Sequence, residues 1–310
     1  MLIEATIQSE KSKILQERYI ELVNGGISPE KILVICLNSY KKKIFTDEIE
    51  KGIRAPIFGK HNIHTFFGLC YNAVAENWVT IENTISGGKP FILPNLCGLE
   101  LSRTFLSESI KEEIFKDYFS KTNLLHQLFK RMQLIVLNGL SEKAALEKSE
   151  ILKESFFEDT KKAYDKFRRL TLKYRSFDYL RQISMLPYIQ EHTDYFKNIE
   201  YLFVDDADEM TYAEFDFIQK LRPQLKEQII CYDTNGASRC GYLSAYKTAV
   251  FEFEKIFKEK AQTPFAKTTA EKRADFIYEQ ILSEKKVKTD NFEIKSFIKR
   301  PDMLDAPFVS

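Results

Sequence analysis

The sequence predicts an α/β fold in which a parallel sheet is flanked by helices. Short apolar runs, each long enough for one strand buried on both faces, alternate with stretches of helical spacing. These runs lie at residues 1–5, 32–37, 201–204 and 228–232. From about residue 99 to residue 174 the pattern is helical with long charged faces, which predicts an inserted all-helical subdomain.

Composition supports a folded protein of about two domains. The chain has 310 residues, of which 44% are hydrophobic, enough to bury a large core. A formal net charge of +1 gives no overall signal for a nucleic-acid partner. The five cysteines show no CxxC spacing, and no signal peptide or membrane-spanning run is evident. We therefore expect a cytoplasmic location and no membrane partner.

The run Tyr201–Val204 ends abruptly in carboxylates, at positions 205, 206, 208 and 209. Acids at the carboxyl end of a central strand lie where open α/β sheets bind ligands, and they suit a hydrated Mg²⁺ and a base for water. The alternative is that these acids form an N-terminal cap for a helix near residues 210–221, because acids favour a helix N-terminus.

A second candidate site lies in the loop that joins the first strand to a helix over residues 12–23. A strand, a loop ending in Lys11 and Ser12, and a helix form the layout of a phosphate-binding loop. Ala5 and Glu10 stand where such a loop needs glycines, and Glu10 adds a negative charge. A plain connection from strand to helix is the alternative.

Aromatic residues mark a third candidate site, at residues 63–71, where a strand gives way to a helix. Exposed aromatic rings at a strand end can stack on unpaired bases, at roughly 1–3 kcal/mol each. The alternative, preferred for Phe66, Leu69 and Cys70, is that they form the core face of the helix.

Several of these segments, taken in order, resemble the UvrD/Rep family of superfamily 1 DNA helicases over roughly residues 1–250. The resemblance rests on four matches: residues 27–35 with the following Cys-Leu-Asn-Ser resemble the approach to motif Ia, residues 63–67 resemble motif Ib, residues 175–180 resemble a DFDDLL-like segment, and residues 202–209 resemble LLVDEFQD. The resemblance implies a RecA-like P-loop NTPase fold, with ATP and Mg²⁺ as cofactors and single-stranded DNA as a partner.

The resemblance also implies roles for single residues. Lys11 would bind phosphate, and Ser12 and Asp205 would hold Mg²⁺. Asp206 would stand where the catalytic Glu orients water. Ser9 and Asn235 would belong to the nucleotide site, Asn235 where motif III supplies a Gln. The residues that would contact DNA are Leu37, Asn38, Thr65, Phe66 and Phe67.

Departures from the family pattern leave the activity open. Besides the missing glycines, Tyr232 stands at the motif III aspartate, and no motif of the second motor domain is found. We expect a motor half that depends on a partner chain for the second motor domain and is not an autonomous helicase. The alternatives are a catalytically dead pseudo-helicase that acts as a DNA-binding or scaffold subunit in DNA repair or recombination, and a truncated gene product.

The expected organisation follows from the same resemblance. The RecA-like domain would occupy residues 1–85 and 176–255, and the helical insertion residues 86–175. Residues 256–310 would be a remnant or the start of a second motor domain.

Overall fold

The computed structural model describes residues 1–5, 11–56, 59–86, 94–110, 115, 121–139, 142–151, 157–233, 245–257 and 260–262. The chain divides into two units, residues 1–266 and 267–310, and all described residues lie in the first. Most of the segment expected to begin a second motor domain therefore lies outside the described residues.

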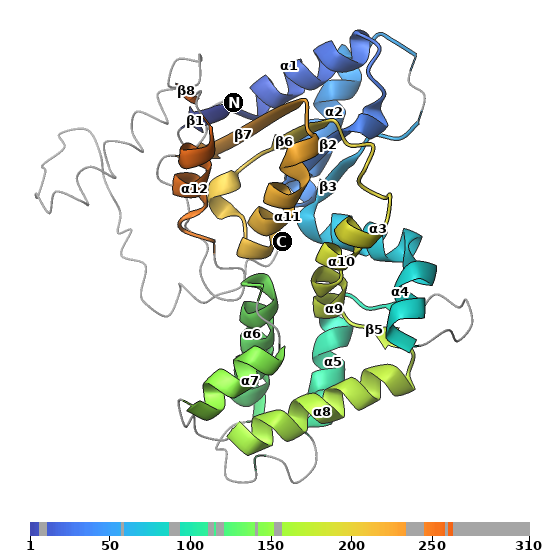
Figure 1. The fold of residues 1–310 in the computed structure, drawn as a ribbon, viewed down its shortest axis with the longest axis vertical. Coiled ribbons are helices and arrows are strands. Elements are labelled where there is room, and N and C mark those ends of the chain that lie inside the picture. Colours follow the sequence, from blue (N-terminus) through green and yellow to red (C-terminus); the bar gives the residue numbers. More distant parts are fainter. Residues whose placement is uncertain are drawn as a thin grey trace, which may run out of the picture. The chain divides into compact units, whose positions relative to one another are not determined.

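A parallel sheet forms the core, in the strand order β3-β2-β6-β7-β1-β8 (Figure 1). Its strands are β1 (Leu2–Ala5), β2 (Ile32–Cys36), β3 (Ile63–Thr65), β6 (Tyr201–Val204), β7 (Glu227–Asp233) and β8 (Lys260–Gln262). The acidic run is the central strand β6, with β2 and β7 on its two sides. The predicted α/β class is confirmed; β8, which has only three residues, was not predicted.

Successive side chains of a strand point to opposite faces of the sheet, and in these strands both sets are mainly apolar. Helices therefore cover both faces. One face packs on α1 (Lys11–Asn24) and α2 (Ser39–Gly52), and its core includes Val34 and Phe203. The other face, with Leu33 and Val204, packs on a second set of helices. These are α3 (Phe66–Glu76), α9 (Tyr179–Ser184), α10 (Leu186–His192), α11 (Tyr212–Leu221) and α12 (Ala249–Ile256).

The chain between α4 (Trp78–Ser86) and α9 is mainly helical where it is described. Its helices are α5 (Leu99–Ser109), α6 (Lys121–Leu137), α7 (Glu142–Ile151) and α8 (Phe157–Lys173). Leu106, Leu128 and Phe167 belong to a separate core within this segment. Every described element within residues 99–174 is a helix, as predicted; the two-residue strands β4 (Asn95–Leu96) and β5 (Ser176–Phe177), which pair in parallel, lie on either side of this stretch.

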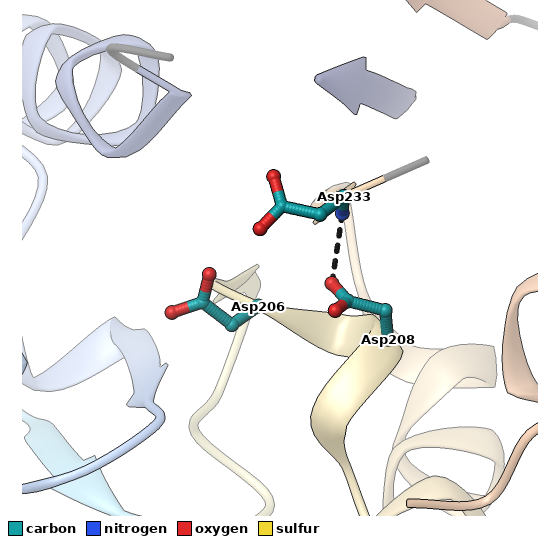
Figure 2. Close-up of side chains that lie close together, drawn as sticks. All are labelled: Asp206, Asp208 and Asp233. Carbon is teal, nitrogen blue, oxygen red and sulfur yellow. Dashed lines mark hydrogen bonds between the residues drawn. The ribbon is translucent and has the colours of Figure 1, made fainter. Parts of the chain in front are cut away.

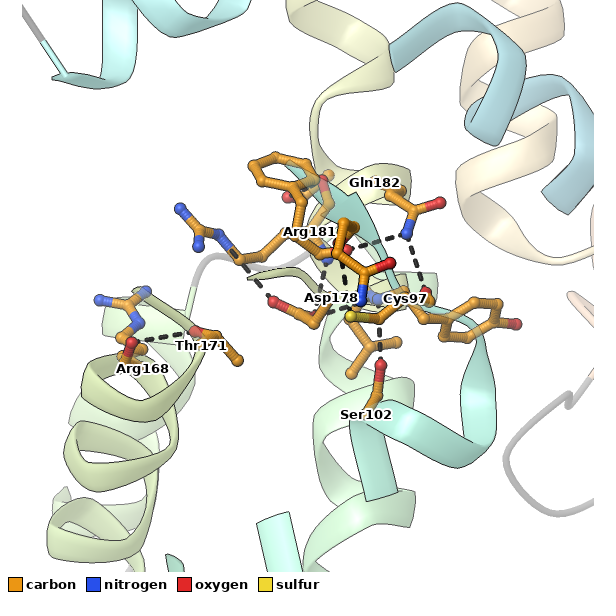
Figure 3. A network of polar contacts seen from close by, with 12 residues as sticks. Cys97, Ser102, Arg168, Thr171, Asp178, Arg181 and Gln182 are labelled. Carbon is orange, nitrogen blue, oxygen red and sulfur yellow. Dashed lines mark hydrogen bonds and ion pairs between the residues drawn. The ribbon is translucent and has the colours of Figure 1, made fainter. Parts of the chain in front are cut away.

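Asp178 organises the chain between β5 and α9 (Figure 3). Its Oδ1 accepts hydrogen bonds from the backbone N–H groups of Leu180 and Arg181, both at 3.1 Å, and so caps α9. The Gln182 side chain donates to the backbone oxygen of Cys97, just after β4, at 2.9 Å. These bonds join β4, β5 and α9, so the segment that resembles DFDDLL stabilises the start of α9 and its contact with the chain after β4.

Candidate active site at the carboxyl edge of the sheet

The acidic segment leaves the sheet through a tight, buried turn. The backbone N–H of Asp205 still donates to Ile35 in β2, at 3.0 Å. Asp206 then adopts a left-handed conformation, with φ 58° and ψ 47°, and the residues Ala207–Glu209 form a short 3₁₀ helix, η2. Non-glycine residues are uncommon in this conformation, although aspartate adopts it more readily than most, and such residues cluster at functional sites. The turn keeps the carboxylates at the carboxyl edge of the sheet.

Thr211, and not the acidic run, caps the helix that follows. Its side chain accepts a hydrogen bond from the backbone N–H of Glu214, at 3.4 Å, at the start of α11. Residues 205–209 precede this cap and are separated from α11. The alternative interpretation of the acids as the helix cap is therefore wrong.

Lys11, the first residue of α1, lies between two carboxylates. Its Nζ is 2.5 Å from Asp206 Oδ1 and 2.7 Å from Asp233 Oδ2. Only 4% of the residue is exposed. Burial by itself lowers the pKa of Lys11, but the attraction of Asp206 and Asp233 outweighs it and raises the pKa above its usual value. The ammonium group therefore stays charged.

Ser12 and Asp205 form a second contact beside Lys11. The Ser12 hydroxyl donates to Asp205 Oδ2 at 2.7 Å. Asp205 is buried, and its Oδ1 accepts no hydrogen bond from the residues that the structure describes. Burial first, and then the neighbouring Asp206, raise the pKa of Asp205. A buried oxygen left in this way is a candidate ligand for a cation.

Asp233 brings the end of β7 into the same site (Figure 2). Its backbone N–H donates to Asp208 Oδ1 at 2.8 Å. One oxygen from each of Asp206, Asp208 and Asp233 lies within 4.8 Å of the others. Lys11 already supplies a positive charge to two of these three carboxylates.

Asp233 was not predicted as a site residue. Tyr232 was aligned with the family's motif III aspartate, but its side chain is buried in the core on the face of the sheet opposite α1 and α2. Asp233, one residue later, is the strand-end acid that reaches Lys11. The available signal was its position directly after an apolar run, which is the same signal that identified Asp205.

Lys41 is a second cation near the site, and it was not predicted from the sequence. It belongs to the first turn of α2, and its Nζ lies 3.8 Å from Asp206 Oδ2. The predicted site residues Ser9 and Asn235, as well as Glu10, lie outside the described residues. Among the predicted nucleotide and metal residues, the structure thus brings together Lys11, Ser12, Asp205 and Asp206.

The predicted DNA-contacting residues lie at the carboxyl ends of β2 and β3. Asn38 and Thr65 are the N-caps of α2 and α3, accepting hydrogen bonds from Lys41 and Gly68 at 2.9 and 3.1 Å. Asn38 is exposed, and Leu37 and Thr65 are half-buried. The positions are compatible with a surface for single-stranded DNA, which stays a prediction.

The two predicted aromatic contacts differ in their burial. Phe66 is buried, and its ring packs against Phe217 with centroids 6.3 Å apart. The structure therefore leaves no exposed ring face at Phe66 for a base, in agreement with the core interpretation and not with the DNA role. Phe67 is half-buried, 5.1 Å from the ring of Tyr179, and stays a candidate.

The oxygen atoms of Ser12 and Asp205 suit Mg²⁺ as ligands, and Lys11 beside them suits a phosphate group. Hydroxyl and carboxylate oxygens are the ligands that Mg²⁺ prefers, and Asp205 Oδ1 is still available. Lys11 is the type of residue that binds phosphate oxygens as a point charge, although here two carboxylates already contact it.

The parallel sheet, with this site at its carboxyl edge, defines an α/β domain of the P-loop NTPase type. The chain belongs to the UvrD/REP helicase N-terminal domain family, which matches residues 1–237. Domains of this family generally use ATP and Mg²⁺ and bind DNA. A comparison with curated proteins returned no match. Within the described residues, none of the helices has the length and apolar character needed to cross a membrane.

Proposed function

We propose that this chain is the nucleotide-binding motor half of a helicase-type protein and binds ATP with Mg²⁺. The observation that supports this proposal best is the 2.7 Å hydrogen bond between Ser12 and Asp205, next to Lys11. It pairs a hydroxyl in the first turn of α1 with the strand-end carboxylate, and in P-loop NTPases the corresponding two groups hold Mg²⁺. The two residues are 193 positions apart in sequence.

Each residue has a defined part in this proposal. Lys11 exchanges its carboxylate partners for phosphate oxygens, and Ser12 and Asp205 would hold Mg²⁺. The charge on the phosphates would be neutralised by a metal ion held there. Asp206 orients the attacking water, from a side chain one methylene shorter than the family's Glu.

The proposal includes single-stranded DNA as a partner, bound along the carboxyl ends of β2 and β3 by Leu37, Asn38, Thr65 and Phe67. It also includes a partner chain that supplies a second motor domain, because translocation needs two motor domains. This partner would supply the cation that completes the ATP site. Loss of such a cation costs on the order of 10³–10⁵ in phosphoryl-transfer rate.

One observation favours a second candidate, a pseudo-helicase that binds DNA or a protein without ATP chemistry. Both oxygens nearest to Lys11 Nζ belong to buried or nearly buried carboxylates. A nucleotide must displace at least one of these ion pairs before its phosphate reaches the lysine. A site that has lost its nucleotide would keep such contacts permanently.

Calorimetric titration with a non-hydrolysable ATP analogue and Mg²⁺ separates the two candidates. The motor-half proposal predicts binding by the wild type and its loss in Lys11→Ala, with Lys13→Ala, an exposed residue on the same helix, as the control. Absence of binding by the wild type, together with single-stranded DNA binding that ATP does not change, would establish the pseudo-helicase. Circular dichroism of each variant verifies that it is folded.

A further inference from the structure

Asp206 lies between two lysines from different helices. Its Oδ1 contacts Lys11 at 2.5 Å, and its Oδ2 lies 3.8 Å from Lys41 Nζ. The first distance is that of a charge-assisted hydrogen bond, whereas the second is only a loose ion pair. Oδ2 accepts no hydrogen bond within the described part of the chain. Lys41 is therefore near the site without being held in it.

The two lysines also differ in how firmly they are fixed. The Lys11 side chain is 5% exposed, while that of Lys41 is 38% exposed. The ammonium group of Lys41 is thus less enclosed than that of Lys11, and its contact with Asp206 is the longer one. A flexible lysine at the rim of an acidic site is suited to follow a ligand that enters from solvent.

The charges around the site favour a bound anion on one side, where the two lysines lie. Lys11 is the first residue of α1 and Lys41 is the third residue of α2. Both helices therefore add the positive end of their dipoles to the charge of the lysines. On the other side lie Asp208 and Asp233, which repel an anion.

We propose that Lys41 is a second phosphate-binding lysine, which contacts the terminal phosphate of a bound nucleoside triphosphate. This inference rests on the proposed function. Asp206 occupies the position assigned to the residue that orients the attacking water, and that water lies next to the terminal phosphate. A side chain that already reaches Asp206 is therefore at the terminal end of the nucleotide, and a nucleoside diphosphate has no group there for it to contact.

Parallel titrations with a non-hydrolysable ATP analogue and with ADP, both with Mg²⁺, test the inference. Lys41→Ala is expected to weaken binding of the ATP analogue about 10-fold, the loss of one charge-assisted hydrogen bond, and to change ADP binding less than about twofold. Lys41→Arg should retain most of the affinity. Lys43→Ala, which changes an exposed lysine of the same helix, is the matched control.

Each outcome decides between the two proposals. If the wild type binds no ATP analogue, both the proposed function and this inference are wrong. If the wild type binds the analogue and Lys41→Ala binds it equally well, only the inference is wrong. Equal losses for ATP analogue and ADP, or a loss confined to single-stranded DNA binding, would also overturn it.

Discussion

Replacement of Lys11 by alanine should destabilise the fold by about 3–5 kcal/mol, the usual cost of removing one partner from a buried ion pair. Asp206 and Asp233 would keep their charges close together, with side chains only 7% and 14% exposed. Loss of the aliphatic stem adds to the cost, because it leaves space beside β7. By contrast, Lys13→Ala, on the exposed side of the same helix, should change stability by no more than about 0.5 kcal/mol.

Urea unfolding followed by circular dichroism measures both variants, with the slope of the transition compared to ensure that the same surface unfolds. Adding Asp233→Asn to Lys11→Ala should recover part of the loss, because one unpaired buried charge is removed. The reasoning is refuted if Lys11→Ala is as stable as Lys13→Ala, or if the second substitution adds its full cost to the first.

Three further predictions concern single residues. Asp233→Asn should strengthen binding of the ATP analogue about 10-fold, because one of the two carboxylates that compete for Lys11 loses its charge; weaker binding in the same titration would instead give Asp233 a direct part in holding the ligand. Burial, assisted by Lys42, lowers the pKa of His64 to about 4, so the folded protein binds fewer protons than the unfolded chain between pH 6.5 and 4. As the pH is lowered from 6.5 to 4, the free energy of unfolding of the wild type should therefore fall by about 2 kcal/mol more than that of His64→Gln, allowing for the partial exposure of the ring. An equal fall in the two proteins would contradict this. Thr211→Ala should cost about 1 kcal/mol in thermal or urea unfolding as the lost cap of α11, and an unchanged midpoint would show that this cap contributes nothing.

The strands were predictable because each is a short apolar run buried on both faces. The run at residues 201–204 became the central strand, and its acids mark the carboxyl edge of the sheet. Lys11 and Ser12 could be selected from one loop because their residue types and order are those of a phosphate site. Their grouping with Asp205 and Asp206 in one site was implied by the resemblance to the helicase family.

The ion pairs could not be predicted, because they depend on strand order and on the turn at Asp206. Residues 1–5 and 227–233 become neighbours only when β1 and β7 pair, which places Asp233 beside Lys11. The left-handed conformation of Asp206 could not be located from the sequence, because aspartate adopts it only in some turns and four acids lie within five residues here. Lys41 could not be assigned to the site from the sequence, because its spacing does not show which helix face meets the acids.

The most direct test of the account is the Mg²⁺ dependence of nucleotide binding in the wild type and in Ser12→Ala. The account predicts that the wild type binds the ATP analogue with Mg²⁺ and much more weakly with a chelator, and that Ser12→Ala loses most of this difference. Binding that is equal with and without Mg²⁺ in both proteins would contradict the assignment of Ser12 and Asp205 as the metal site.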